Sequence, residues 1–137
     1  MDILASATYT AADAGTAHTA ATIRRSLRNT SGLNLIMEVT ADTGLATDLL
    51  DVKVQASVCG DWIDVAYFQQ HQLDDGAAIY ATRISRDTAL APLKNVALVA
   101  TNSRNIFSDI DSYRAHTTLF DAGAGVSVTF SVKGFWD

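Results

Sequence analysis

The side chains in this sequence that could do acid chemistry are two close carboxylate pairs, Asp74 with Asp75 and Asp109 with Asp111. A calcium loop would need further oxygen ligands at set spacing, and neither stretch supplies them. Glycoside hydrolysis would need two carboxylates facing each other across a cleft, which the spacing neither singles out nor excludes. We therefore interpret both pairs as side chains that cap turns.

The histidines and the cysteine do not have the sequence spacing of metal ligands. His18, His71 and His116 are far apart in the sequence, so we interpret each as an ordinary surface or strand histidine. Cys59 is the only cysteine, which excludes a disulfide or an all-cysteine zinc site within one chain and favours a structural thiol. The GxSxG, HExxH, GxxxxGK and strand-linked GxGxxG patterns are also missing from the sequence. We predict no enzymatic activity, no cofactor and no metal.

Charge restricts the classes of partner. The formal net charge of −5 would repel nucleic acid and anionic membranes. Arg24, Arg25 and Arg28 form one basic cluster without the interleaved aromatic residues of single-strand binders, so we interpret it as a solvated or subunit-facing patch. The sequence has no run of eighteen apolar residues and no secretory signal pattern. We expect a soluble protein, made in the cytoplasm, that binds neither nucleic acid nor membrane.

The elements that would position any site are strands. Apolar and polar residues alternate from Leu50 to Val58, which is the pattern of a strand with one face in water. The same period of two recurs from Leu33 to Ala41, from Tyr113 to Leu119 and from Val126 to Val132. The predicted core residues are Val52, Val54, Val58, Val128, Phe130 and Val132.

Turn signals separate these runs. The stretches NTSG, ADTG, CGD, DDG and DAGAG hold the Asx and glycine residues that reverse a chain. The segment from Ser85 to Ala100 contains the only proline, Pro92, and fits either a loop before an edge strand or a short helical turn. A length of 137 residues favours one domain. We predict an all-β fold with little helix: an antiparallel β-sandwich, jelly-roll-like in its connections.

The two ends of the chain differ from this body. Residues 1–22 are rich in Ala and Thr, so we expect an N-terminal arm or edge strand with no part in the core, followed by a sandwich domain over residues 23–137. Phe135 and Trp136 place two large aromatic side chains beside the C-terminus. They either fold back on the sandwich edge or dock on a neighbour.

Trp62 directly follows the turn at Cys59–Asp61. Strict alternation gives its strand aromatic bulk on both faces, which is typical of a central strand or of a strand packed on a partner. We expect Trp62 to pack in the core beside the turn, with a ligand or partner contact as the alternative. On this alternation the two faces hold Ile63, Val65 and Tyr67 on one side, and Trp62, Asp64, Ala66 and Phe68 on the other.

Two long stretches, TADTGLATDLLDVKVQASVCGDWIDVAYFQQ and SYRAHTTLFDAGAGVSVTFSVKG, resemble a recurrent pattern in small structural proteins of tailed bacteriophages. The shared features are a first strand ending in VTA, a glycine-containing turn, a strand pair with Trp62, and a terminal hairpin ending in SVTFSV. The match covers residues 33–134 and consists of strand and turn residues. Cys59 departs from the pattern, which has Asp or another small polar residue before Gly60, and the segment up to Thr22 lies outside it.

The resemblance implies a non-enzymatic virion structural protein, and in particular a capsid decoration or cement protein. Such a protein would be made in the host cytoplasm, bind the major capsid protein on the outer capsid surface, and stabilise the head. We favour a homo-oligomer, a trimer before a dimer, because strands with bulk on both faces leave apolar surface that self-association would bury. The candidate partner contacts are Arg24, Arg25, Tyr67, Phe135 and Trp136.

Two other functions stay open at this point. A tail, neck or baseplate component could use the same fold. A carbohydrate-binding sandwich would use Trp62, Tyr67 or Phe68 as a platform on which a sugar ring stacks.

Overall fold

The computed structural model describes residues 2–10, 16–17, 21–22, 32–58, 60–85, 93–94, 112–120 and 125–136. Throughout this described part the regular elements are strands, and all of their pairings are antiparallel. The strands are β1 (Asp2–Thr10), β2 (Thr16–Ala17), β3 (Ala21–Thr22), β4 (Gly32–Thr43), β5 (Leu49–Val58), β6 (Asp61–Tyr67), β7 (His71–Gln72), β8 (Ala78–Ser85), β9 (Leu93–Lys94), β10 (Ser112–Phe120) and β11 (Ser127–Trp136).

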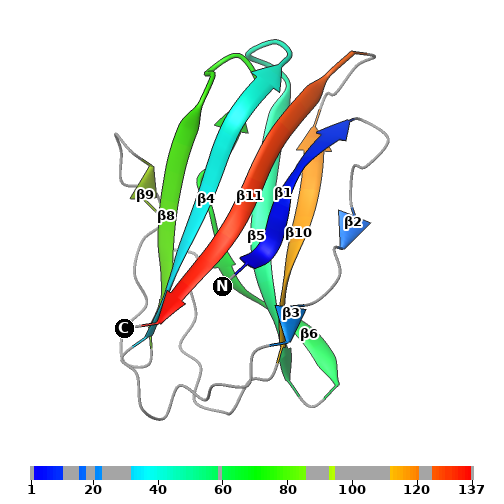
Figure 1. The fold of residues 1–137 in the computed structure, drawn as a ribbon. Helices are drawn as coiled ribbons and strands as arrows, with labels where there is room; N and C mark the ends of the chain where they lie inside the picture. The colour runs from blue at the N-terminus through cyan, green and yellow to red at the C-terminus, as the bar shows by residue number, and fades with distance from the viewer. Residues whose placement is uncertain are drawn as a thin grey trace.

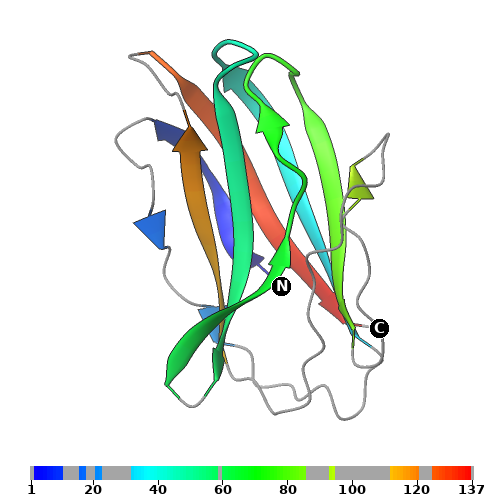
Figure 2. The ribbon, with the colours of Figure 1, turned by 180° about the vertical axis from the view of Figure 1, so that it is seen from behind.

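The strands form two sheets that face each other as layers (Figure 1). One sheet has the order β1-β11-β4-β8-β9. The other has the order β2-β10-β5-β6, with β3 also paired to β10 and β7 to β5 (Figure 2). The predicted all-β antiparallel sandwich is therefore confirmed. The order is compatible with jelly-roll-like connections, which stay a prediction.

The core lies between the sheets and follows the alternation of the sequence. In β10, Tyr113 and Leu119 are buried while Arg114 and His116 are half-buried on the opposite face. The largest side chains that are fully buried include Tyr80, Tyr113 and Phe130. The side chain of Val58 lies outside the described residues. The other predicted core residues are all buried, namely Val52, Val54, Val128, Phe130 and Val132.

β-Bulges in β4 and β6 each move the later side chains of their strand to the opposite face. In β4, Ala41 pairs with Thr129 and Val39 with Phe130, so Thr40 is the extra residue. The residues after Thr40 therefore change faces, and Ala41, which alternation places inside, is exposed. In β6 the pairs Val54–Ala66 and Gln55–Asp64 leave one extra residue between them in the same way.

The N-terminal segment belongs to the sandwich. Strand β1 is an edge strand that pairs with β11 from Asp2 to Thr10. Ile3 is 2% exposed and lies in the core, and the Tyr9 ring packs against Phe130 at 4.9 Å between centroids. Of the two forms expected for residues 1–22, an arm or an edge strand, β1 has the second. The expectation that this segment takes no part in the core is wrong for Ile3, because one isoleucine in the right register is enough to reach the interior.

The C-terminal strand β11 lies between β1 and β4, within its sheet rather than at its edge. Trp136 pairs with Leu33 and is partly buried against the core, while Phe135 faces outward and is 47% exposed. One of the two terminal aromatic side chains has folded back, and the other has not.

Several sequence interpretations fall on residues outside the described part, namely those of His18, Arg24, Arg25, Arg28, Cys59, Pro92, Asp109 and Asp111. Asp74 and Asp75 are described and exposed in the connection between β7 and β8. There the Asp75 N–H donates to the Gln72 carbonyl, at 3.1 Å, in a tight turn.

Candidate functional site

A polar network covers the outward face of β10, β5 and β6. It is positioned by antiparallel register, which sets side chains of neighbouring strands opposite each other. Gln55 of β5 pairs with Arg114 on one side and Asp64 on the other. We call the members of this network the outer-face cluster: Lys53, Gln55, Trp62, Asp64, Tyr67, Arg114 and His116.

Asp64 is the acceptor at the centre of the cluster. The Tyr67 hydroxyl donates to Asp64 Oδ2 at 2.6 Å, and Lys53 Nζ donates to the same oxygen at 2.9 Å. Gln55 Nε2 donates to Asp64 Oδ1 at 2.7 Å. Both carboxylate oxygens are therefore used by donors of the protein itself.

These donors fix the protonation state of Asp64. Burial by itself would raise the pKa of this carboxyl group, but the hydrogen bonds from Tyr67, Gln55 and Lys53, together with the charge of Lys53, lower it to about 2. Asp64 is thus an ionised acceptor across the neutral pH range. It cannot serve as a general acid there.

Gln55 connects this carboxylate to an arginine. Its side chain is nearly buried, and its Oε1 accepts a hydrogen bond from Arg114 Nε at 2.8 Å. The guanidinium carbon Cζ of Arg114 lies 4.3 Å from the centroid of the Trp62 ring, in cation–π geometry. Arg114 is therefore held in one place by an amide at Nε and by an aromatic ring at its face.

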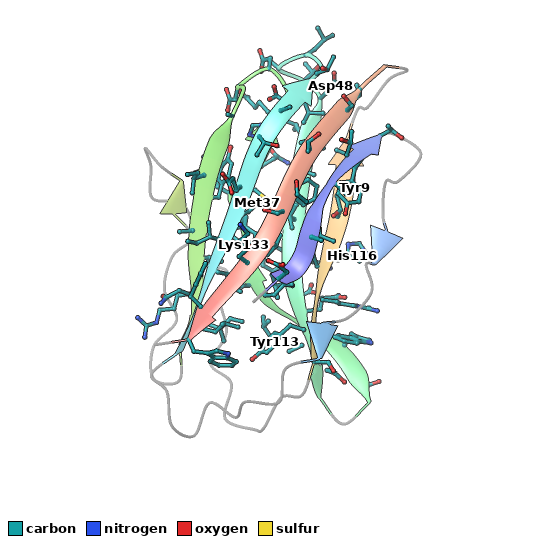
Figure 3. All side chains as sticks on the ribbon, in the orientation of Figure 1. Tyr9, Met37, Asp48, Tyr113, His116 and Lys133 are labelled. Atoms are coloured by element: carbon teal, nitrogen blue, oxygen red, sulfur yellow. The ribbon has the colours of Figure 1, made fainter. Side chains whose placement is uncertain are left out.

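His116 lies next to these cations. It pairs with Lys53 across the sheet and stands two residues from Arg114 on β10, where Figure 3 labels it. Burial lowers the pKa of the imidazole, and the charges of Lys53 and Arg114 lower it further, against a smaller opposing effect of Asp64. Its Nδ1 atom is buried and has no hydrogen-bond partner in the described structure.

A second polar cluster lies inside the sandwich. His71 is fully buried; its Nδ1 is 2.7 Å from the Tyr80 hydroxyl and its Nε2 is 2.9 Å from Asp42 Oδ2. The N–H of Gly76 also donates to Asp42 Oδ2, at 3.0 Å. Because β7 belongs to one sheet and β4 and β8 to the other, these contacts join the two layers. Their burial makes this cluster a structural brace.

Trp62 is not in the core, so that expectation is wrong. It pairs with Ser57 on the polar face of β5 and is half-buried there beside Arg114. The predicted faces of β6 are also wrong beyond the bulge. Val65 and Ala66 are both buried, and Tyr67 lies on the outward side with Asp64.

Of the five candidate partner contacts, only Tyr67 belongs to the outer-face cluster. Phe135 and Trp136 lie on β11, in the other sheet, and Arg24 and Arg25 are outside the described residues. The structure therefore does not bring Tyr67 together with the C-terminal pair. Phe68, considered as a sugar-stacking residue, is 5% exposed and belongs to the core.

Sequence reasoning missed Arg114, Gln55 and His71. The alternation predicts that the side chains of Arg114 and Gln55 point outward, but their pairing depends on which strands are neighbours. His71 was interpreted as ordinary because its partners Asp42 and Tyr80 are 29 and 9 residues away in the chain.

Over the part of the chain that the structure describes, no group of three or more His, Cys, Asp or Glu side chains could hold a metal ion. The same residues contain no helix long and apolar enough to cross a membrane. A scan against protein-family models, a search of curated proteins and a search of solved structures each found no match.

Proposed function

We propose that this chain is a non-enzymatic virion structural protein that decorates the capsid, and that the outer-face cluster contacts the major capsid protein. The resemblance to small phage structural proteins motivates the class of function. The observation that supports the contact face is the Trp62–Arg114 pair with its 4.3 Å spacing. Trp, Tyr and Arg are the residues most enriched among those that dominate binding energy at protein interfaces.

The position of this cluster also suits a contact with a large partner. The β5–β6 hairpin, which carries Trp62 just after its turn, projects from the end of the sandwich in both views (Figures 1 and 2). Gly60 in this turn has a φ of 88°, a left-handed conformation that favours glycine. The side chains of Gln55, Asp64 and Arg114 are held by hydrogen bonds before a partner arrives, which lowers the entropic cost of binding.

A decoration assay tests the proposal. Undecorated particles of the phage that encodes this chain are mixed with wild-type or variant protein, and occupancy is measured by sedimentation and gel densitometry. Trp62→Ala should lower stability by only about 1 kcal/mol, below the roughly 3–5 kcal/mol of a core tryptophan, because the ring is half-buried. It should remain folded and lose most of its occupancy.

Leu45→Ala is the matched control, since Leu45 is an exposed apolar residue in the connection between β4 and β5, at the end of β5 opposite to the β5–β6 turn. It should decorate like the wild type. Full occupancy by folded Trp62→Ala would remove the outer-face cluster from the contact. Absence of binding by the wild type to capsids, with binding to tails or baseplates instead, would favour the tail-component alternative.

The carbohydrate-binding alternative is less well supported. Phe68 is in the core, and one face of the Trp62 ring is covered by Arg114. A glycan array probed with the wild-type protein tests this alternative directly. A specific signal that Trp62→Ala abolishes would replace the capsid proposal.

A further inference from the structure

Arg114 is a cation that its neighbours orient and do not neutralise. Lys53 and Asp64 form an ion pair at 2.9 Å and compensate each other. Between that pair and Arg114 stands the neutral amide of Gln55, which donates to Asp64 and accepts from Arg114 Nε. Within the described residues no carboxylate contacts Arg114.

Among the residues that the structure describes, the contacts of Arg114 leave one edge of its guanidinium for a ligand. Nε is used by Gln55, and the ring of Trp62 covers a face at 4.3 Å from Cζ. The two terminal nitrogens, Nη1 and Nη2, carry the remaining donors, and this edge matches the two oxygens of a carboxylate. A guanidinium that is already immobilised loses less conformational entropy on forming such a pair.

We infer that Arg114, held by Gln55 and Trp62, is a binding site for a carboxylate side chain of a partner protein. This assignment rests on the proposed role of the outer face as the capsid contact and gives that contact its chemistry: an Asp or Glu of the capsid protein paired with Arg114. A polyanion such as nucleic acid fits less well, because the chain carries a net charge of −5 and the cluster offers a single uncompensated arginine.

The experiment uses the full chain labelled with nitrogen-15. It is titrated with an acetylated Gly-Glu-Gly amide peptide, and chemical shifts are followed at the Arg114 Nε–H and the Trp62 indole N–H. We expect saturable shifts at both groups. The peptide with Gln in place of Glu should produce none, because it has the same shape without the charge.

Substitution tests the role of the two terminal guanidinium nitrogens of Arg114. Arg114→Lys keeps the charge but removes the paired donors, so it should weaken binding of the Glu peptide by about tenfold. The affinity is measured from the chemical shift of the Trp62 indole N–H. Arg83→Lys on β8 is the control in the other sheet and should bind as the wild type does. Equal affinity of Arg114→Lys and wild type, or equal shifts with the Glu and Gln peptides, would overturn the site.

Two further measurements are needed. One compares a phosphate ligand with a carboxylate ligand, and the other separates the binding site on Arg114 from the decoration function. Inorganic phosphate should bind more weakly than the Glu peptide at equal ionic strength, and tighter binding of phosphate would overturn the carboxylate assignment. In the decoration assay, Arg114→Lys should lose occupancy. Full occupancy by Arg114→Lys would show that this site is not part of the capsid contact, but it would not contradict the decoration function. Failure of the wild type to decorate would sink that function, whatever the peptide shows.

Discussion

At the scale of the residue, Asp64 is the group whose ionisation the outer-face cluster requires. Three neutral or cationic donors converge on it, and its pKa of about 2 is below the ordinary value of 3.8. A carboxyl group with a depressed pKa in the folded state contributes stability that is fully present above its unfolded pKa. That contribution is lost as the pH falls through the folded pKa.

The resulting prediction concerns acid stability. Asp64→Asn should lower the free energy of unfolding by about 1 kcal/mol at neutral pH; the contribution is modest because the side chain is partly solvated. The difference from wild type should shrink as the pH falls from about 4 towards 2, since the wild-type carboxylate becomes protonated over that range. Urea unfolding at a series of pH values measures it.

Asp61→Asn serves as the control for this prediction, because Asp61 is exposed at the start of the same strand. It should change the unfolding free energy little at any pH. A difference between Asp64→Asn and wild type that stays constant down to pH 2 would show that the ionised state of Asp64 is not what stabilises the cluster.

At the scale of the element, β7 is a two-residue strand that one histidine ties to the opposite sheet. His71 meets Tyr80 from β8 and Asp42 from the end of β4, and the bulge at Thr40 is what turns Asp42 inward to reach it. Without the bulge, Asp42 would continue the outward series of its strand. Bulges of this kind re-aim side chains and are features of the fold rather than defects.

His71→Phe tests this brace. Phenylalanine fills the space but leaves the Asp42 carboxylate without one of its donors in a nearly buried position, so unfolding should become easier by about 2–3 kcal/mol. Tyr80→Phe should cost about 1 kcal/mol. The double variant should cost less than the sum of the two, because both changes break the same contact. Strict additivity in a double-mutant cycle would show that the His71–Tyr80 contact carries no coupling.

The last strand supplies a second element-scale prediction. Trp136 packs against the core and pairs with Leu33, whereas Phe135 points outward. Trp136→Ala should therefore lower the unfolding free energy by about 2–3 kcal/mol, and Phe135→Ala by less than about 1 kcal/mol. Thermal and urea unfolding of the two variants measure the contrast. Truncation after Lys133 should likewise destabilise the body, because it removes three ladder pairs from a strand inside its sheet.

At the scale of the whole molecule, the two sheets present different outer faces. The outward face of β10, β5 and β6 carries the outer-face cluster. The outward face of the other sheet carries the exposed side chains of Ile79 on β8 and Phe135 on β11. Ile36, half-buried, lies on β4 between these strands and pairs with Ala81 and Lys133. Ile79 pairs with Glu38 and Phe135 with Asn34, so the two side chains are separated on a face that also holds polar residues. Exposed apolar side chains of this kind suit burial against another subunit.

If the proposed homo-oligomer forms, the outward face of the sheet that carries Ile79 and Phe135 is where we expect its subunits to meet. The double variant Ile79→Glu, Phe135→Glu should then elute as a monomer in size-exclusion chromatography with light scattering, whereas Trp62→Ala should keep the wild-type mass. The charges placed at the contact would repel each other and leave the core untouched. A double variant with unchanged oligomeric mass would move the subunit contact elsewhere.

The sequence by itself determined the strands and most of the core. Alternation is a local property of one strand, so the inward positions of β5, β10 and β11 could be predicted without knowing their neighbours. The same reasoning failed after Thr40 in β4 and from Ala66 onward in β6, because a single extra residue reverses every later side chain and leaves no local mark. That is why Tyr67 was assigned to the wrong face. Trp62 precedes the bulge and was correctly placed on the face of Asp64, but that face points outward and not into the core.

Only the tertiary structure decided which side chains meet. Gln55 and Arg114 are 59 residues apart, and Asp42 and His71 are 29 apart. Whether such residues touch depends on strand order and register, which are set by the packing of two whole sheets rather than by any one segment. The sequence therefore predicted the scaffold well, while the oriented arginine on its surface and the histidine in its interior arise from pairings that exist only in the folded chain.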